Sequence, residues 1–414
     1  MLQNIRELVQ TEEIPQEFVA GKKMSELGTI SNAFLLIHDE LIEDFGPMRE
    51  LNRISVDDDI LMEIDCSGRL VYPAWCDPHT HLVYAGSREK EFVGRIKGQT
   101  YEQIAQNGGG ILNSARLLHE TPAEELYEQS VKRIFEIMRQ GTGAIEIKSG
   151  YGLTTEDELK MLQVIQWIRQ TTPLCVRATF LGAHAIPEAY KNNTAAYVDL
   201  IINEMIPQVA AEELADYIDV FCEKGFFSVE DTERILMAGI KYGLRPKIHA
   251  NELGRTGGVQ AGVKYNALSV DHLEHLGEEE IETLSGSETM PTLLPGASFF
   301  LNLPYAPARK MIDAGLPVAL ASDFNPGSSP SGNMNFIGSL ACLKLKMTPQ
   351  EAINAATINA AYAMGVSDRL GSIARGKIAN VFITRPIPGI EYFPYMFGSN
   401  LIETLILNGE IQSF

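Results

Sequence analysis

The sequence predicts a (β/α)₈ barrel, in which eight parallel strands and their helices close into a ring, with a small β domain beside it. Between residues 71 and 365, apolar β-rich stretches alternate with amphipathic helical stretches, the order that produces a parallel sheet with crossover helices. Eight strand candidates can be counted there, and eight strand–helix units fit a barrel of about 250 residues plus insertions. An open, doubly wound sheet is the competing architecture.

The predicted barrel strands are short apolar runs, each followed by polar residues. They cover residues 70–76, 144–148, 175–181, 217–222, 246–249, 268–271, 290–294 and 318–321. Helix signals support this division. Thr121, Pro122 and Glu124 form an N-cap, a first-turn proline and a capping-box acid, and Gly141 marks the end of that helix. The same opening at 348–351 precedes residues 352–364, which we expect to form one helix that closes the barrel.

The two ends of the chain predict a second, smaller domain. Strand-like runs occur at 33–37, 380–384 and 403–409, with turn residues between them, including those at 57–59. Neither end is long enough to bury a core alone, so we expect the two to combine. The predicted organisation is residues 1–69 and 369–414 as two parts of one β-sandwich domain, and residues 70–368 as the barrel.

Composition limits the classes of function. The chain has 414 residues, is 45% hydrophobic and carries a net charge of −20, which opposes binding to nucleic acid and favours a small-molecule substrate. No apolar run is long enough for a membrane span, and no secretory signal is visible at the start, so we expect a cytoplasmic protein without a membrane partner. The five cysteines are scattered without paired spacing and predict reduced core thiols.

Polar side chains with metal-binding chemistry follow several of the predicted strands. His79 and His81 come after the first strand, His249 ends the fifth and Asp323 follows the eighth. The carboxyl ends of barrel strands meet at one face, so these side chains should converge. Three imidazoles and one carboxylate suit Zn²⁺ or a related divalent ion with a position left for water. Asp323 is also placed to accept a proton from that water.

Each of these residues also has a simpler explanation. A buried histidine is often satisfied by a backbone carbonyl, and an aspartate often caps a turn such as the one before Pro326. The metal hypothesis depends on the shared position of the four residues at strand ends.

Four segments carry a resemblance to a known family. They are residues 76–81 (CDPHTH), 147–152 (IKSGYG), 247–252 (KIHANE) and 322–327 (SDFNPG). With these segments in this order, the chain resembles the amidohydrolase superfamily, whose metal-dependent barrels stand beside a small β-sandwich. Within that superfamily it is most similar to enzymes of histidine degradation that hydrolyse the cyclic amide of 4-imidazolone-5-propanoate to N-formimidoyl-L-glutamate. The resemblance covers nearly the whole chain.

The resemblance implies a set of site residues. It implies that His79, His81, His249 and Asp323 hold one Zn²⁺ or Fe ion per subunit and that the protein is a homodimer. The residues implied to contact the substrate are Arg88, Tyr151, His184 and Glu252, with Asn325, Gly327 and Ser328 near the product. His272 matches a histidine that assists the substrate rather than binding the metal. Asp323, Glu252 and His272 are therefore the candidate catalytic residues.

Elementary chemistry agrees with some of these roles. Arg88 can form a bidentate, charge-assisted pair with a propionate carboxylate, or it can be a surface arginine paired with a neighbouring glutamate. Tyr151 can donate a hydrogen bond or simply pack as an aromatic ring. Glu252 can relay a proton, or it can complement the dipole of a helix that starts nearby.

One departure concerns relatives with two metal ions, which place a carbamylated lysine after the fourth strand. This chain has Glu223 and Lys224 there, with the lysine out of phase, so one ion is expected, although Glu223 could hold a second. Two alternative functions remain at this stage. One is another hydrolase of the superfamily, a ring aminohydrolase or a metal-dependent dipeptidase, and the other is a barrel that has lost catalysis and serves as a scaffold.

Overall fold

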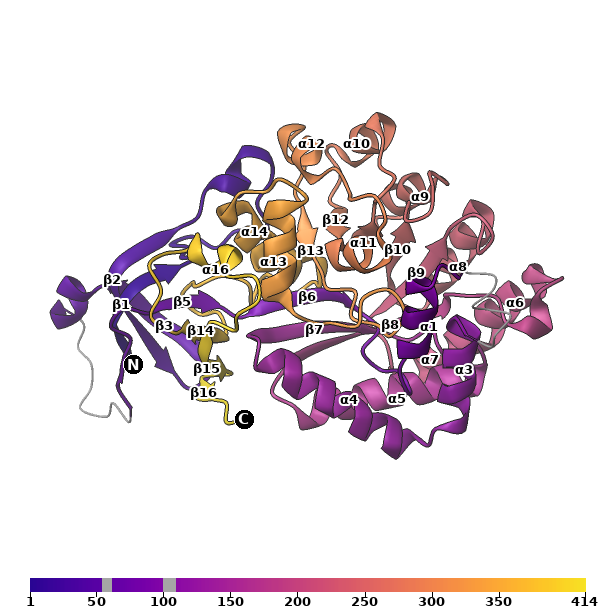
Figure 1. The fold of residues 1–414 in the computed structure, drawn as a ribbon, viewed down its shortest axis with the longest axis horizontal. Helices are drawn as coiled ribbons and strands as arrows, with labels where there is room; N and C mark the ends of the chain where they lie inside the picture. Colours follow the sequence, from indigo (N-terminus) through magenta and orange to yellow (C-terminus); the bar gives the residue numbers. More distant parts are fainter. Residues whose placement is uncertain (54–61, 100–108) are drawn as a thin grey trace.

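The computed structural model describes residues 1–53, 62–99 and 109–414, so the predicted turn at 57–59 lies outside the described residues. Figure 1 shows two β structures side by side, a barrel with its helices and a smaller sheet that holds both chain termini. Each has its own buried hydrophobic cluster. The helices of the described part include none that is both long enough and apolar enough to span a membrane.

The barrel sheet consists of eight parallel strands in sequence order. They are β6 (Trp75–Thr80), β7 (Thr142–Lys148), β8 (Cys175–Ala183), β9 (Tyr217–Cys222), β10 (Arg245–Ala250), β11 (Ser269–His272), β12 (Met290–Leu293) and β13 (Ala319–Leu320). The ring closes after β13, where Thr80 and Phe324 form a parallel bridge and the Asp323 N–H donates to the His79 carbonyl at 3.0 Å. The closing contact therefore lies within the predicted site.

Helices connect successive strands. Those before β9 are α1 (Glu89–Ile96), α3 (Ile111–Glu120), α4 (Ala123–Met138), α5 (Thr155–Thr171), α6 (Thr194–Leu200) and α7 (Ile206–Ala211), with a 3₁₀ turn η3 (Glu188–Tyr190) and a π-helical turn η4 (Ile201–Met205). Those that follow are α8 (Val229–Lys241), α9 (Gly258–Lys264), α10 (Glu278–Leu284), α11 (Pro295–Leu301), α12 (Ala308–Asp313), α13 (Met334–Leu343), α14 (Pro349–Ala356) and α15 (Ile358–Ala363).

Two predicted helix features differ from the structure. The first turn of α4 lacks the predicted capping box, because the Thr121 hydroxyl donates to the Leu117 carbonyl of the preceding helix and Pro122 is the N-cap. The predicted helix over 352–364 is broken at Thr357, which has φ −121° and ψ −94° and separates α14 from α15. The capping box at Thr348 and Glu351 is present as predicted.

The smaller sheet joins the two ends of the chain. Its strands are β1 (Leu2–Val9), β2 (Thr29–His38), β3 (Leu41–Pro47), β4 (Ile64–Asp65), β5 (Leu70–Pro73), β14 (Val381–Thr384), β15 (Ile402–Leu407) and β16 (Glu410–Ile411). They run in the order β16-β15-β14-β5-β1-β2-β3, with β4 paired to β1. The short helices η1 (Gly21–Ser25), η2 (Met48–Arg53) and α16 (Tyr392–Tyr395) complete the described elements.

The predicted first barrel strand, 70–76, is wrong in its first half. Residues 70–73 form β5, which pairs with β1 and β14 in the smaller sheet, and the barrel strand β6 begins only at Trp75. Tyr72 and Trp75 lie on either side of this change of sheet and pack together with Phe382 and Phe393 in an aromatic cluster. We therefore propose that the barrel begins at Trp75 rather than at residue 70.

Candidate metal centre and active site

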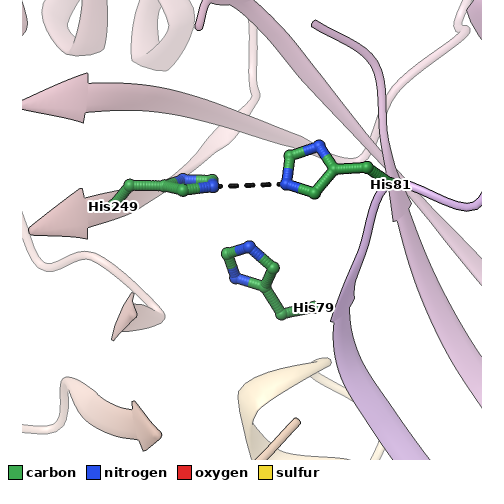
Figure 2. A group of neighbouring side chains, drawn as sticks. All are labelled: His79, His81 and His249. Atoms are coloured by element: carbon green, nitrogen blue, oxygen red, sulfur yellow. Dashed lines mark hydrogen bonds between the residues drawn. The ribbon is translucent and has the colours of Figure 1, made fainter. Parts of the chain in front are cut away.

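The three histidines predicted to bind a metal converge at one end of the barrel. Figure 2 shows His79, His81 and His249 with their rings turned toward one another. The Nε2 atoms of His249 and His81 are 3.4 Å apart, and Asp323 Oδ1 lies 3.7 Å from His79 Nε2 and 3.8 Å from His81 Nε2. All four side chains are buried. The structure thus brings together the four residues that the sequence singled out.

The backbone at this end of the barrel is strained in several places. His272, Leu273, Asn251 and Asp323 all have positive φ, between 55° and 83°, although none is a glycine. Such conformations persist only where the surrounding contacts enforce them, and they are concentrated at functional sites. These backbone conformations end strands β10 and β11 and turn the chain after β13, and they set the directions of the side chains at these positions.

The donor set fits one divalent metal ion. His79 Nδ1 is 2.6 Å from Asp271 Oδ2, while its buried Nε2 has no hydrogen-bond partner among the described residues. Burial lowers the pKa of the three imidazoles, so their rings are neutral near pH 7 and can offer lone pairs. Two ligand atoms that are each bonded to one zinc ion at ~2.0–2.1 Å lie about 3.4 Å apart in a tetrahedral site, close to the separations found here.

Asp323 is oriented by its own loop. The Ser328 hydroxyl donates to Asp323 Oδ2 at 3.0 Å, which leaves Oδ1 facing the histidines. Burial raises the pKa of Asp323 to about 6, although the nearby charge of His272 opposes that shift. Asp323 Oδ1 therefore has the position of a metal ligand.

His272 and two glutamates form a second cluster next to the histidines. His272 Nε2 lies 3.7 Å from Glu252 Oε2, and its Nδ1 lies 3.6 Å from Glu274 Oε1. Burial raises the pKa of Glu252 to about 7, while the two glutamates together raise the pKa of His272 well above its usual range against the opposing effect of burial. A carboxyl group that titrates near neutral pH beside a cationic imidazole can move protons during a reaction.

Arg88, Tyr151 and His184 line the site on another side. The rings of His184 and His81 stack with centroids 4.9 Å apart, and Tyr151 lies 5.5 Å from His184. The Arg88 Nε donates to the Ser114 hydroxyl at 2.9 Å, whereas its buried Nη2 has no hydrogen-bond partner within the described parts of the chain. Arg88 Nε also lies 3.9 Å from Glu91 Oε1, so the predicted pairing with a neighbouring glutamate is present, but both side chains are largely buried rather than on the surface.

The loop after β13 places its predicted residues differently. The Asn325 side chain is used within the loop, since its Oδ1 accepts the N–H groups of Gly327 and Ser328 and its Nδ2 donates to the Ser328 hydroxyl. Gly327 lies against Arg88, and a β-carbon at this position would collide with Arg88 Nη1. Asn325 therefore orders the loop and Gly327 leaves space for Arg88, and contact of either with a product stays a prediction.

Glu223 is used elsewhere in the structure. Its Oε1 accepts the Glu252 N–H at 2.7 Å, and it belongs to neither of the two groups of potential metal ligands among the described residues. Those groups are His79, His81 and His249, and His79, His272 and Asp323. Glu223 Oε1 thus holds the backbone of Glu252, while its buried Oε2 has no hydrogen-bond partner among the described residues, and the expected single ion stays a prediction.

Sequence reasoning missed several residues that support the site. Asp271 faces His79, Asp219 Oδ2 lies 3.0 Å from His249 Nδ1, and Lys148 lies between the two aspartates. A signal was present, because Glu146 and Lys148 in the run 144–148 and Asp219 in the run 217–222 are charged residues among apolar ones. Such residues are rare in buried strands unless they are paired. Ser114, which positions Arg88, left no comparable signal.

Comparison with known proteins identifies the family. The model of the amidohydrolase family matches residues 70–411. The chain belongs to the amidohydrolase family. This membership covers the barrel and the strands that follow it, and it agrees with a hydrolase built around a metal centre.

Relatives within the amidohydrolase family extend the match to the whole chain. Proteins named imidazolonepropionase from Flavobacterium johnsoniae and Christiangramia forsetii are 60% and 57% identical, and each alignment covers 99% of both chains. One from Brevibacillus brevis is 43% identical over 95% of this chain and 93% of its own. The resemblance predicted from the four segments is thereby confirmed, at the level of the imidazolonepropionases.

Solved structures confirm the fold class. Guanine deaminase of Escherichia coli has a TM-score of 0.72 at 16% identity, with 100% of this chain and 98% of that chain covered. An adenosine deaminase from Xanthomonas campestris, solved with bound zinc, has a TM-score of 0.71 at 15% identity, covering 98% and 92%. At such low identity these likenesses concern the fold alone.

Proposed function

We propose that this chain hydrolyses the cyclic amide of 4-imidazolone-5-propanoate to N-formimidoyl-L-glutamate, a step of histidine degradation. The observation that carries the proposal is the 57–60% identity, along nearly the whole chain, to proteins named imidazolonepropionase. In this reaction the bond between the ring carbonyl carbon and its nitrogen breaks. The oxygen of water is added to the carbon, and a proton is added to the departing nitrogen.

The residues that would hold the metal are His79, His81, His249 and Asp323, with one zinc or iron ion per subunit. When bound, such an ion would polarise a carbonyl group and lower the pKa of a water molecule toward neutral pH. The neutral imidazoles and the buried, unpartnered His79 Nε2 support this assignment. Zinc and iron are both compatible with three histidines and one aspartate.

Glu252, His272 and Asp323 are the residues that we assign to proton transfer. The reaction needs a group that accepts a proton from water and a group that supplies one to the ring nitrogen. Burial raises the pKa of Glu252 to about 7, so its carboxyl group can change protonation state near neutral pH, while Asp323 Oδ1 faces the proposed metal ligands His79 and His81. His272 lies beside Glu252 and, as a cation, stabilises negative charge there.

Arg88 is the residue that we assign to the substrate carboxylate. Its Nε is held by Ser114, which leaves the buried and unpartnered Nη2 to bind an anionic oxygen. Tyr151 and His184 form the adjoining wall, and burial lowers the pKa of His184 to about 3, so its ring stays neutral beside the planar substrate. One carboxylate and one small ring match this arrangement.

The proposal is tested by comparing substrates on protein with a defined metal content. We expect formation of N-formimidoyl-L-glutamate from imidazolonepropionate, and turnover of guanine, cytosine and dipeptides roughly 10⁴ to 10⁵-fold slower, the discrimination that polar recognition achieves. Faster turnover of a purine or a dipeptide would assign the chain to another hydrolase of the family. Light scattering of the same sample tests the predicted homodimer.

A further inference from the structure

Five buried charged side chains of β7, β9, β10 and β11 lie next to the histidines. They are Glu146 and Lys148 on β7, Asp219 on β9, Lys247 on β10 and Asp271 on β11, and each is at most 1% exposed. Burial of a charge is costly unless the group has well-placed partners. The partners of these five groups therefore indicate what each contributes.

Lys148 is the branching point of this cluster. Its Nζ lies 2.6 Å from Glu146 Oε1, 2.8 Å from Asp219 Oδ2 and 3.6 Å from Asp271 Oδ2. These contacts connect β7 to β9 and β11. One ammonium group thus contacts carboxylates from three strands, two of which also contact proposed metal ligands.

The same aspartate oxygens face the histidines. Asp271 Oδ2 is hydrogen-bonded to His79 Nδ1 at 2.6 Å, whereas Asp219 Oδ2 lies 3.0 Å from His249 Nδ1 as an ion-pair contact without the alignment of a hydrogen bond. The other oxygen of each carboxylate is held locally, since Asp271 Oδ1 accepts the Ser269 hydroxyl and Asp219 Oδ1 accepts the backbone N–H of His249. Each Oδ2 is therefore shared between one histidine and Lys148.

We propose that Lys148 is a positioning residue of the metal centre, which aligns Asp219 and Asp271 so that His249 and His79 both hold their proton on Nδ1. Each ring then presents its Nε2 lone pair to the centre. A carboxylate behind a metal-binding histidine fixes the ring and its tautomer in this way. Here one lysine does so for two ligands at once. The inference rests on the proposed metal site.

Lys247 provides a matched control for a purely structural role. It is as buried as Lys148 and contacts the same glutamate, but its further partners are the backbone carbonyls of Pro78 and Ala363 at 3.1 Å. Loss of either lysine removes one buried cation from the cluster. Only loss of Lys148 removes the cation that Asp219 and Asp271 share.

The experiment compares Lys148→Met with Lys247→Met in the full chain. Zn²⁺ affinity is measured by competition with a chelator, and the histidine tautomers of the metal-free protein are measured by NMR after ¹⁵N-histidine labelling. Lys148→Met is expected to weaken Zn²⁺ binding about 10 to 100-fold and to give mixed tautomers at His79 and His249. Lys247→Met is expected to keep the wild-type tautomers. Wild-type tautomers and affinity in Lys148→Met would overturn the inference.

A second variant covers the case in which Lys148→Met does not fold because two carboxylates lose their cation. Lys148→Met combined with Asp271→Asn leaves one buried carboxylate fewer without its cation than Lys148→Met alone. This double variant should give mixed tautomers at His249, and it should bind Zn²⁺ more weakly than Asp271→Asn alone. Equal binding by these two variants, with wild-type tautomers at His249, would overturn the inference. Failure of the wild-type chain to bind Zn²⁺ would instead count against the proposed metal site, and the tautomer measurement needs no metal.

Discussion

Glu252 shows how burial prepares a side chain for catalysis. The carboxyl group faces His272, and burial raises its pKa to about 7, although the charge of His272 opposes the shift. A group that accepts a proton must be ionised, so the activity that depends on it is present above the pKa and is lost as the pH falls through it. The pH dependence of the reaction can therefore report on this residue.

Glu252→Gln is expected to lower kcat by roughly 10² to 10⁴-fold with little change in KM, because glutamine keeps the shape but cannot accept a proton. In the wild type, kcat/KM should fall as the pH drops below about 7, and the variant should lose this ionisation. Steady-state rates across pH measure both effects, with Glu230→Gln on the exposed side of α8 as the control. An unchanged kcat and pH profile with metal bound would leave proton transfer to Asp323 and His272.

Arg88→Ala is expected to raise KM by about 10 to 150-fold with a smaller effect on kcat. Its contact to a remote carboxylate exists in both the ground state and the transition state, and a charge-assisted hydrogen bond contributes about 1.5–3 kcal/mol. Substrate-saturation curves measure this. Arg116→Ala is the control, because that arginine is exposed on α3 and pairs with Glu120. An unchanged KM would place Arg88 outside the substrate pocket.

At the residue scale, the sequence was sufficient to predict the site side chains at strand ends. It was insufficient to predict the buried side chains that hold them in place. His79, His249 and Asp323 follow recognisable strands, so the topology of a parallel barrel alone predicts that they meet. The pairing of Lys148 with Asp219 and Asp271 depends instead on the register of three strands and on which face each residue occupies. Strand spacing alone does not give that register.

At the element scale, the two wrong predictions lie where the local sequence pattern fits the predicted element and the observed one equally well. Residues 70–76 form one apolar run, yet the chain changes from the smaller sheet to the barrel between Pro73 and Trp75, and both sides of the change are buried. The helix over 352–364 breaks at Thr357, whose hydroxyl donates to the Ile353 carbonyl at 2.6 Å. Neither the change of sheet nor the break in the helix alters the hydrophobic period from which strands and helices are predicted.

Helix capping gives a prediction at the same scale. Thr348→Ala should destabilise the protein by about 1 kcal/mol, because the Thr348 hydroxyl accepts the Glu351 N–H at the start of α14 and Glu351 also pairs with Arg309. Thr121→Ala should cost less than about 0.5 kcal/mol, since Thr121 does not cap α4. Urea denaturation measures both. Equal losses for the two variants would contradict the capping described here.

For the whole molecule, the closed barrel was predictable and the contact that closes it was not. Alternation of strands and helices is a property of the sequence, and it predicts the eight strands and the composite domain of the two termini. The bridge between Thr80 and Phe324 joins segments more than 200 residues apart, so no local sequence pattern specifies it. It also sets Asp323 against His79, so assembly of the site depends on closure of the fold.

The central claim is that a metal held by His79, His81, His249 and Asp323 is required for hydrolysis of imidazolonepropionate. The most direct measurement is a titration of metal-free protein with Zn²⁺ or Fe²⁺, with formation of N-formimidoyl-L-glutamate followed at each addition. Activity should rise linearly to one equivalent per subunit, and His249→Ala should remain inactive over the same range while it keeps the circular dichroism of the wild type. Full activity in the metal-free protein, or in His249→Ala, would contradict the account.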